Sequence, residues 1–209
     1  MSHHSPPVTE RLLIGILRGF GARQVEALVP VCQRGGLGHL EITMNSPEAA
    51  GSIRLARGLA GEALQIGAGT VVDERQLDEA LAAGARFIVT PVVNPTIIRR
   101  CVAAGVPIFP GAFSPSEIVQ AWELGATMVK VFPADQLGPA FIKNVKAPLP
   151  HIKLLPTGGV TLASLSAYAK AGADGFGVGS PLFDARRIRA GDWSWLEQQC
   201  RAFVNAAQS

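Results

Sequence analysis

Short apolar segments alternate with amphipathic segments at a regular spacing from residue 12 onward. The amphipathic segments have the periodicity of helices, and many of them begin at a Ser, Thr, Asp or Asn and end at a glycine, as capped helices do. The apolar segments have the length of buried strands. The eight predicted strands are residues 12–17, 39–43, 64–68, 87–89, 107–109, 127–132, 152–156 and 175–179.

This βα unit repeats about every 20 to 25 residues and predicts the α/β class. Eight parallel strands with crossover helices form a closed (β/α)8 TIM barrel more economically than an open sheet. An open doubly wound sheet remains the alternative, although the first βα turn, "LRGFGARQ", lacks the G-x-G-x-x-G spacing of dinucleotide-binding folds. No linker of different composition divides the 209 residues. We therefore expect one barrel domain over residues 11–209, after a flexible N-terminal leader at residues 1–10.

Charge and hydropathy exclude several classes of partner. The 19 basic and 16 acidic residues give a net charge of +3, and the basic residues are scattered, so no nucleic-acid partner is expected. No run of about 18 apolar residues occurs, and the leader lacks the pattern of a signal peptide. The three cysteines are far apart and show no C-x-x-C spacing. These features predict a reduced, cytoplasmic protein without a membrane span.

The few histidines do not form a metal-binding motif. His3 and His4 lie in the leader, while His39 and His151 are isolated from each other. No H-x-x-E-H, H-x-H or Cys/His cluster supplies metal ligands, so no metal site is expected. The chain also lacks the G-x-S-x-G elbow of many hydrolases and the P-loop of NTP-dependent enzymes.

Lys130 lies inside a segment, "MVKVFPAD", that otherwise has the pattern of a buried strand. Alternation places its side chain on the same strand face as Met128 and Phe132. Burial would lower the pKa of the amine and leave it neutral, so that it could form an imine with a ketone or an aldehyde. The alternative is a structural lysine that pairs with a carboxylate or extends toward solvent.

Glu41, in "HLEITMNSP", is a second ionisable residue inside an apolar strand. A buried carboxylate beside a lysine can move protons during imine formation and carbon–carbon bond chemistry, directly or through water. The alternative is a buried ion pair with Lys130, which would contribute little net stability. Two such residues in two strands of one barrel favour a catalytic role.

Two glycine-rich segments, "PTGGV" and "FGVGSPL", follow the seventh and eighth predicted strands. Barrels often bind phosphate at these positions through backbone N–H groups, although glycines in βα turns are also common without a ligand. Arg18, at the end of the first strand, could clamp a carboxylate or could be an ordinary surface arginine. Thr70 could donate its hydroxyl to the same carboxylate or could cap the next helix.

Taken in order, these motifs resemble a known family. "LEITMNSP", "GAGTV", "FIVTP", "PGAFSPSE", "VKVFPAD", "GPAFIKNVKAPLP", "LLPTGGV" and "GVGS" are similar to the class I 2-keto-3-deoxy-6-phosphogluconate (KDPG) aldolases. That group includes the 4-hydroxy-2-oxoglutarate (KHG) and 2-keto-3-deoxy-6-phosphogalactonate aldolases. The resemblance covers residues 11–205.

The resemblance implies a (β/α)8 barrel, usually a homotrimer, that reversibly cleaves a phosphorylated 2-keto-3-deoxy sugar acid to pyruvate and glyceraldehyde 3-phosphate. It places the imine-forming lysine at Lys130 and the proton-shuttling glutamate at Glu41. It implies no metal and no organic cofactor. The positions that match substrate-binding residues are Thr70, Pro91 and Phe132 in the pocket, and Thr157, Gly158, Gly159, Gly179 and Ser180 in the phosphate loops.

One departure from the family pattern leaves the sugar specificity open. Some members carry an arginine four residues beyond the glutamate to hold the pyruvate carboxylate, and this chain has Asn45 there. Arg18, in "ILRG", resembles the replacement in other members, including the galactonate branch. "ILRG" and "NSP" resemble the galactonate enzymes, whereas Thr157 and "KAPLPHIKLLPTGGV" resemble the gluconate and hydroxyoxoglutarate enzymes. A phosphate-binding barrel isomerase and a non-catalytic binding protein are the alternatives outside this chemistry.

Overall fold

The computed structural model describes residues 11–209, so the leader predicted at residues 1–10 lies outside the described residues. The strands are β1 (Leu12–Leu17), β2 (His39–Thr43), β3 (Gln65–Gly69), β4 (Ile88–Val89), β5 (Ile108–Phe109), β6 (Gly111–Ala112), β7 (Val129–Val131), β8 (Leu154–Pro156) and β9 (Gly175–Val178). The helices are α1 (Ala22–Arg34), α2 (Ala49–Leu59), α3 (Glu74–Ala82), α4 (Pro95–Ala103), α5 (Pro115–Glu123), α6 (Ala134–Lys146), α7 (Leu162–Lys170), α8 (Ala185–Arg189) and α9 (Trp193–Gln208).

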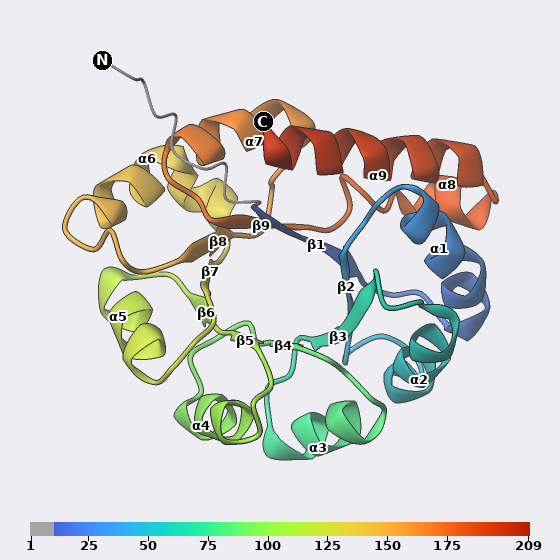
Figure 1. Cartoon of the computed structure of the whole chain (residues 1–209), viewed down its shortest axis with the longest axis horizontal. Coiled ribbons are helices and arrows are strands. Elements are labelled where there is room, and N and C mark those ends of the chain that lie inside the picture. Colours follow the sequence, from blue (N-terminus) through green and yellow to red (C-terminus); the bar gives the residue numbers. More distant parts are fainter. Residues whose placement is uncertain (1–10) are drawn as a thin grey trace.

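The strands form a closed ring with the helices outside it (Figure 1). All strand pairs are parallel and fall into two hydrogen-bonded sheets, β5-β4-β3-β2-β1-β9 and β6-β7-β8. An isolated bridge between Thr157 and Gly177 connects the end of β8 to β9. The predicted (β/α)8 barrel with a single domain is therefore confirmed, and the open sheet is excluded.

The fifth strand differs from its prediction. The predicted strand 107–109 is a longer extended segment that divides into β5 and β6 on either side of Pro110. Proline lacks a backbone N–H, so it cannot donate to a strand ladder, and pairing changes from β4 to β7 at this residue. The predicted sixth strand, 127–132, is reduced to β7, with bends at residues 127 and 128 before it and a turn at residue 132 after it.

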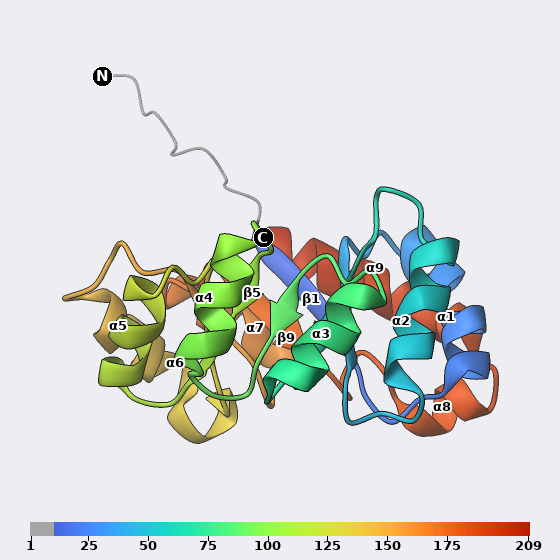
Figure 2. The ribbon, with the colours of Figure 1, turned by 90° about the horizontal axis from the view of Figure 1, so that it is seen from below.

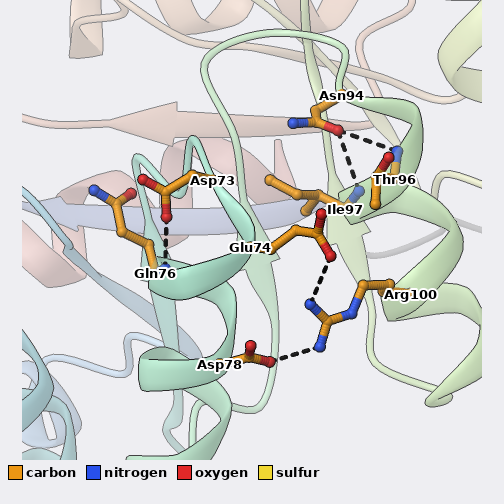
Figure 3. Close-up of polar contacts among 8 residues, drawn as sticks. All are labelled: Asp73, Glu74, Gln76, Asp78, Asn94, Thr96, Ile97 and Arg100. Carbon is orange, nitrogen blue, oxygen red and sulfur yellow. Dashed lines mark hydrogen bonds and ion pairs between the residues drawn. The ribbon is translucent and has the colours of Figure 1, made fainter.

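Polar side chains set where the helices begin and how they align. Asp73 accepts a hydrogen bond from the first turn of α3 at 2.7 Å, and Asn94 accepts two from the first turn of α4 (Figure 3). Arg100 on α4 pairs with Glu74 and Asp78 on α3, at 3.1 Å and 2.6 Å. These pairs are solvent-exposed, so they orient two neighbouring helices and add little to stability.

The barrel interior is filled unevenly, because glycines occupy the inward positions of β3 and β9. A methyl group on Gly67 would overlap the ring of Phe87, and one on Gly177 would overlap the side chain of Thr157. These glycines therefore make room for side chains from the neighbouring strands. An apolar cluster fills the middle of the barrel and separates its two ends: Ile14, Phe87, Val89, Phe109 and Leu155.

The C-terminal helix closes the wall beside the first strand. Figure 2 shows the barrel from the side, with the C-terminus at the end where β1 begins. There the backbone of Arg11 exchanges two hydrogen bonds with the side chain of Gln208, both at 3.2 Å. None of the helices in residues 11–209 combines the length and hydropathy that a membrane crossing requires.

Candidate active site

Lys130 projects from β7 into the barrel, and only 3% of the residue is exposed. Its Nζ atom lies 4.7 Å from the ring centroid of Phe132. Burial lowers the pKa of the Lys130 amine; the charge of Arg18 lowers it further, while the charge of Glu41 opposes both effects. The amine is thus shifted toward the neutral, nucleophilic form.

Glu41 projects inward from β2 and is 1% exposed. Its Oε1 atom is buried and has no hydrogen-bond partner in the part of the chain that the structure describes. Burial raises the pKa of the carboxyl group, while the charges of Lys130 and Arg18 counteract that rise. The side chain lies directly above Gly69 on β3, where a methyl group would overlap Oε1 and Cδ. A residue with a side chain at position 69 would therefore displace this carboxylate.

Lys130 and Glu41, both among the described residues, are not joined by an ion pair. The buried ion pair that the sequence left open as an alternative is therefore wrong. Two buried ionisable groups that influence each other's pKa without direct contact are costly to stability. Such an arrangement is typical of a site where a ligand or a water molecule occupies the space between the groups.

Arg18 extends from the end of β1 and is held by two neighbouring loops. Its Nη1 donates to Oδ1 of Asn45 at 3.1 Å, and its Nη2 donates to Oγ1 of Thr70 at 3.2 Å. Thr70 has a φ of +56°, a conformation that is strained for a β-branched residue. The sequence pointed to Arg18 and Thr70, but it gave Asn45 no role beyond replacing an arginine.

A cavity of about 170 Å³ at the C-terminal ends of the strands contains most of the predicted site. Lys130 and Arg18 line it, and no other charged residue does. Gly158 and Gly159 have φ values of +93° and +71°, which favour glycine and turn the backbone at the cavity wall. The other lining residues are Ile16, Phe132, Thr157, Val160, Gly179, Ser180 and Pro181.

Three predicted residues lie outside the lining of this cavity. Glu41 is covered within the barrel, and Thr70 reaches the cavity only through its bond to Arg18. Pro91 is half-buried, and its carbonyl group packs against Gly111, where a methyl group would overlap it. The structure therefore brings nine of the eleven predicted residues to the cavity or to its lining side chains, leaving Glu41 and Pro91 outside it.

A larger cavity, of about 680 Å³, lies at the opposite, N-terminal end of the strands. His39 lines it and contacts the ring of Phe87, with 5.7 Å between the ring centroids. Burial lowers the pKa of His39. The apolar cluster in the middle of the barrel separates this cavity from Lys130. No group of three His, Cys, Asp or Glu residues able to hold a metal ion occurs in residues 11–209.

Comparisons with known proteins agree with this geometry. Residues 9–199 match the family described as "Aldolase: KDPG and KHG aldolase". The 2-dehydro-3-deoxy-6-phosphogalactonate aldolase of Escherichia coli (strain K12) is 38% identical, over 95% of each chain. The 2-dehydro-3-deoxy-phosphogluconate aldolase of Treponema pallidum (strain Nichols) is also 38% identical, over 82% of this chain and 83% of that protein.

A solved structure adds chemical information about the same fold. The KDPG aldolase from Legionella pneumophila, with pyruvate captured as a covalent carbinolamine intermediate, is 26% identical and has a TM-score of 0.83, covering 93% of this chain and 95% of that one. The family match spans most of the chain, and the relatives at 38% identity cover more than two thirds of it. This protein is therefore a carbon–carbon lyase that belongs to the KDPG and KHG aldolase family.

Proposed function

We propose that this protein is a class I aldolase that reversibly cleaves 2-keto-3-deoxy-6-phosphogluconate to pyruvate and glyceraldehyde 3-phosphate. The observation that carries the proposal is the state of Lys130. Its amine is buried, its pKa is lowered, it has no ion pair with Glu41, and it lines a cavity whose far wall is glycine-rich backbone. A nucleophilic amine and a phosphate-binding wall in one cavity match a phosphorylated keto acid.

In the proposed mechanism the neutral Lys130 amine attacks the C2 ketone and forms a carbinolamine. Protonation of its hydroxyl group and loss of water then give a protonated imine, whose positive nitrogen accepts the electron pair released when the C3–C4 bond breaks. The C4 hydroxyl loses its proton as the aldehyde forms. The products are free glyceraldehyde 3-phosphate and an enamine of pyruvate on Lys130. Protonation at C3 and hydrolysis of the imine then release pyruvate and restore the amine.

Glu41 is the proposed proton carrier. It takes the C4 hydroxyl proton, through a water molecule, and later returns a proton to C3 of the enamine. Two features of Glu41 support this role: burial raises its pKa, and its Oε1 atom has no hydrogen-bond partner among residues 11–209. A raised pKa makes the carboxylate a stronger base, and its unpartnered oxygen is free to bind a water molecule or a substrate hydroxyl.

The remaining predicted residues have proposed binding roles. Arg18 and Thr70 hold the carboxylate of the pyruvate half, because Arg18 lines the cavity beside Lys130 and Thr70 supports it. Phe132 and Pro91 form apolar walls. The phosphate is bound by the loops after β8 and β9, through Thr157, Gly158, Gly159, Gly179 and Ser180. No metal and no organic cofactor takes part in this mechanism.

Borohydride reduction in the presence of pyruvate tests the central step. We expect irreversible inactivation and an added mass on the peptide that contains Lys130. The variant Lys130→Met should be neither active nor labelled. Labelling of Lys143, Lys146, Lys153 or Lys170 in place of Lys130 would refute the assignment. The absence of both labelling and turnover would instead favour a phosphate-binding isomerase or a non-catalytic binding protein.

The galactonate epimer is the second candidate substrate. Arg18 with Asn45, in "ILRG" and "NSP", favours it, and the Escherichia coli relative carries that name. Thr157 favours the gluconate series, which the Treponema pallidum relative carries in its name. Cleavage rates for the two phosphorylated epimers and for 4-hydroxy-2-oxoglutarate, measured side by side, decide between them. A ratio above ten for the galactonate epimer would overturn the preference for gluconate.

A homotrimer in the cytoplasm completes the proposal. Three apolar side chains are exposed on successive loops at the cavity end of the barrel, and they favour association of this face with further copies of the chain: Val72 at 44%, Val92 at 54% and Phe113 at 48%. The three cysteines are free thiols, which fits a reducing compartment. Light scattering should give three times the 21.9 kDa of one chain, and Phe113→Glu should reduce that mass.

A further inference from the structure

We propose that Asn45 is a positioning residue for the substrate carboxylate: it fixes the guanidinium of Arg18 while leaving its positive charge free for the ligand. The inference rests on the proposed function, because that function assigns the carboxylate to Arg18. Asn45 lies in the loop between β2 and α2, and β2 neighbours the strand that carries Arg18. Its Oδ1 atom accepts the 3.1 Å hydrogen bond from Nη1 of Arg18.

Both acceptors that hold Arg18 are uncharged. Asn45 takes one hydrogen from Nη1 and Thr70 takes one from Nη2, so three of the five N–H groups of the guanidinium remain for a ligand. A carboxylate at position 45 would form a charge-assisted pair with Arg18 and compete with the substrate for it. An amide supplies the same acceptor geometry without that competition.

The backbone near Asn45 is tied to the strand that carries Arg18. The hydroxyl of Ser46 accepts a 2.8 Å hydrogen bond from the backbone N–H of Gly19, the residue after Arg18. The same hydroxyl lies 2.9 Å from Oγ1 of Thr43, at the end of β2. The loop is therefore fixed to both strands on either side of the Asn45 amide. A surface residue without a role would not need this support.

The charge of Arg18 also acts on the catalytic lysine. The charged groups that face Lys130 are Glu41 from β2 and Arg18 from the end of β1. Arg18 lowers the pKa of Lys130 and Glu41 raises it. An acidic residue at position 45 would offset the Arg18 charge, so the pKa of Lys130 would rise and imine formation would require a higher pH. A purely structural role for Asn45 would not move this pH dependence.

The test compares Asn45→Asp and Asn45→Ala with the control Asn144→Asp, which adds the same charge on the exposed surface of α6. For Asn45→Asp we expect KM for the sugar acid to rise about 10- to 100-fold. The pyruvate concentration that gives half-maximal borohydride inactivation should rise by the same factor. We expect kcat to fall less, and the acid limb of the pH profile to move to higher pH. Asn45→Ala should raise KM about fivefold without moving the acid limb.

Suppose that borohydride and pyruvate inactivate the wild-type enzyme, but Asn45→Asp changes neither KM nor the acid limb of the pH profile. That result would overturn the role of Asn45 and leave the proposed function standing. If wild-type enzyme is not inactivated by borohydride and pyruvate, the proposed function fails instead. The role of Asn45 is then decided in the Lys130→Met background, where no imine forms. Ligand-detected NMR of pyruvate binding should weaken when Asn45→Asp is added; equal binding would refute the role.

Discussion

The substitution Gly69→Ala should separate imine formation from proton transfer. A methyl group on Gly69 would overlap Oε1 and Cδ of Glu41 and lie 3.0 Å from its Cγ. The backbone of Gly69 is not in the left-handed region, so alanine fits the strand and the side chain of Glu41 must move. Removing the overlap requires the carboxylate to shift by about 1 Å or more, which is enough to misplace a proton carrier.

The magnitude follows from the two steps that this site supports. A misplacement of about 1 Å costs on the order of 10²-fold in rate, and loss of a general base costs about 10²- to 10⁴-fold. We therefore expect cleavage by Gly69→Ala to fall at least about 100-fold. Borohydride trapping of pyruvate should persist, because the three atoms nearest to the new methyl group all belong to Glu41 and Lys130 is on β7.

Two assays follow these steps independently. Deuterium exchange into the methyl group of pyruvate, observed by NMR, reports proton transfer at C3, and borohydride labelling reports the imine. Gly67→Ala is the matched control, since it lies on the same strand and face but overlaps Phe87 in the core. It should lower stability without a selective loss of exchange. If Gly69→Ala, which retains Glu41, exchanges deuterium into pyruvate at the wild-type rate, the assignment of Glu41 as proton carrier is refuted.

Three further predictions concern stability. The folded-state pKa of Glu41 is raised, so the carboxyl group ionises more readily in the unfolded state, and ionisation opposes folding as pH rises above 4.5. The free energy of unfolding of Glu41→Gln minus that of wild type should therefore be larger at pH 8 than at pH 4.5 in chemical denaturation. A difference that does not change with pH would contradict this. Ser52→Ala removes a buried hydroxyl that has no hydrogen-bond partner among the described residues, and it should raise the free energy of unfolding by about 1 kcal/mol. A lower free energy of unfolding would show that the hydroxyl does form a stabilising hydrogen bond. Tyr168→Phe removes the 2.9 Å hydrogen bond to the carbonyl of Ala134 and should cost about 1 kcal/mol in thermal denaturation; no change would show that this bond is not stabilising.

The sequence was most informative at ionisable residues that lie inside apolar runs. Apolar runs with helical segments between them predicted the barrel, because buried parallel strands have no polar face. Lys130 and Glu41 were visible for the same reason: each is an ionisable residue within such a run. The division of the fifth strand at Pro110 was missed, because the apolar run ends there while the extended backbone continues.

Contacts between strands were beyond the reach of the sequence. The position of Glu41 over Gly69 depends on the register of β2 against β3, where Glu41 is paired with Gly67. The support of Arg18 by Asn45 and Thr70 combines three loops that are 27 and 52 residues apart in the chain. Local periodicity contains no information about such distances. The positive φ of Thr70 was equally hidden, since threonine does not favour it.

Glu41 and Lys130 stand on different parts of one continuous barrel wall. Backbone hydrogen bonds cross both boundaries between the two sheets: the N–H of Thr127 donates to the carbonyl of Ile108, and the N–H of Asp174 donates to the carbonyl of Leu154. Glu41 stands on the larger sheet and Lys130 on the smaller one. The distance between these two side chains is therefore set by the whole ring of strands and not by a single sheet. A substitution that alters strand pairing far from either residue would also alter that distance.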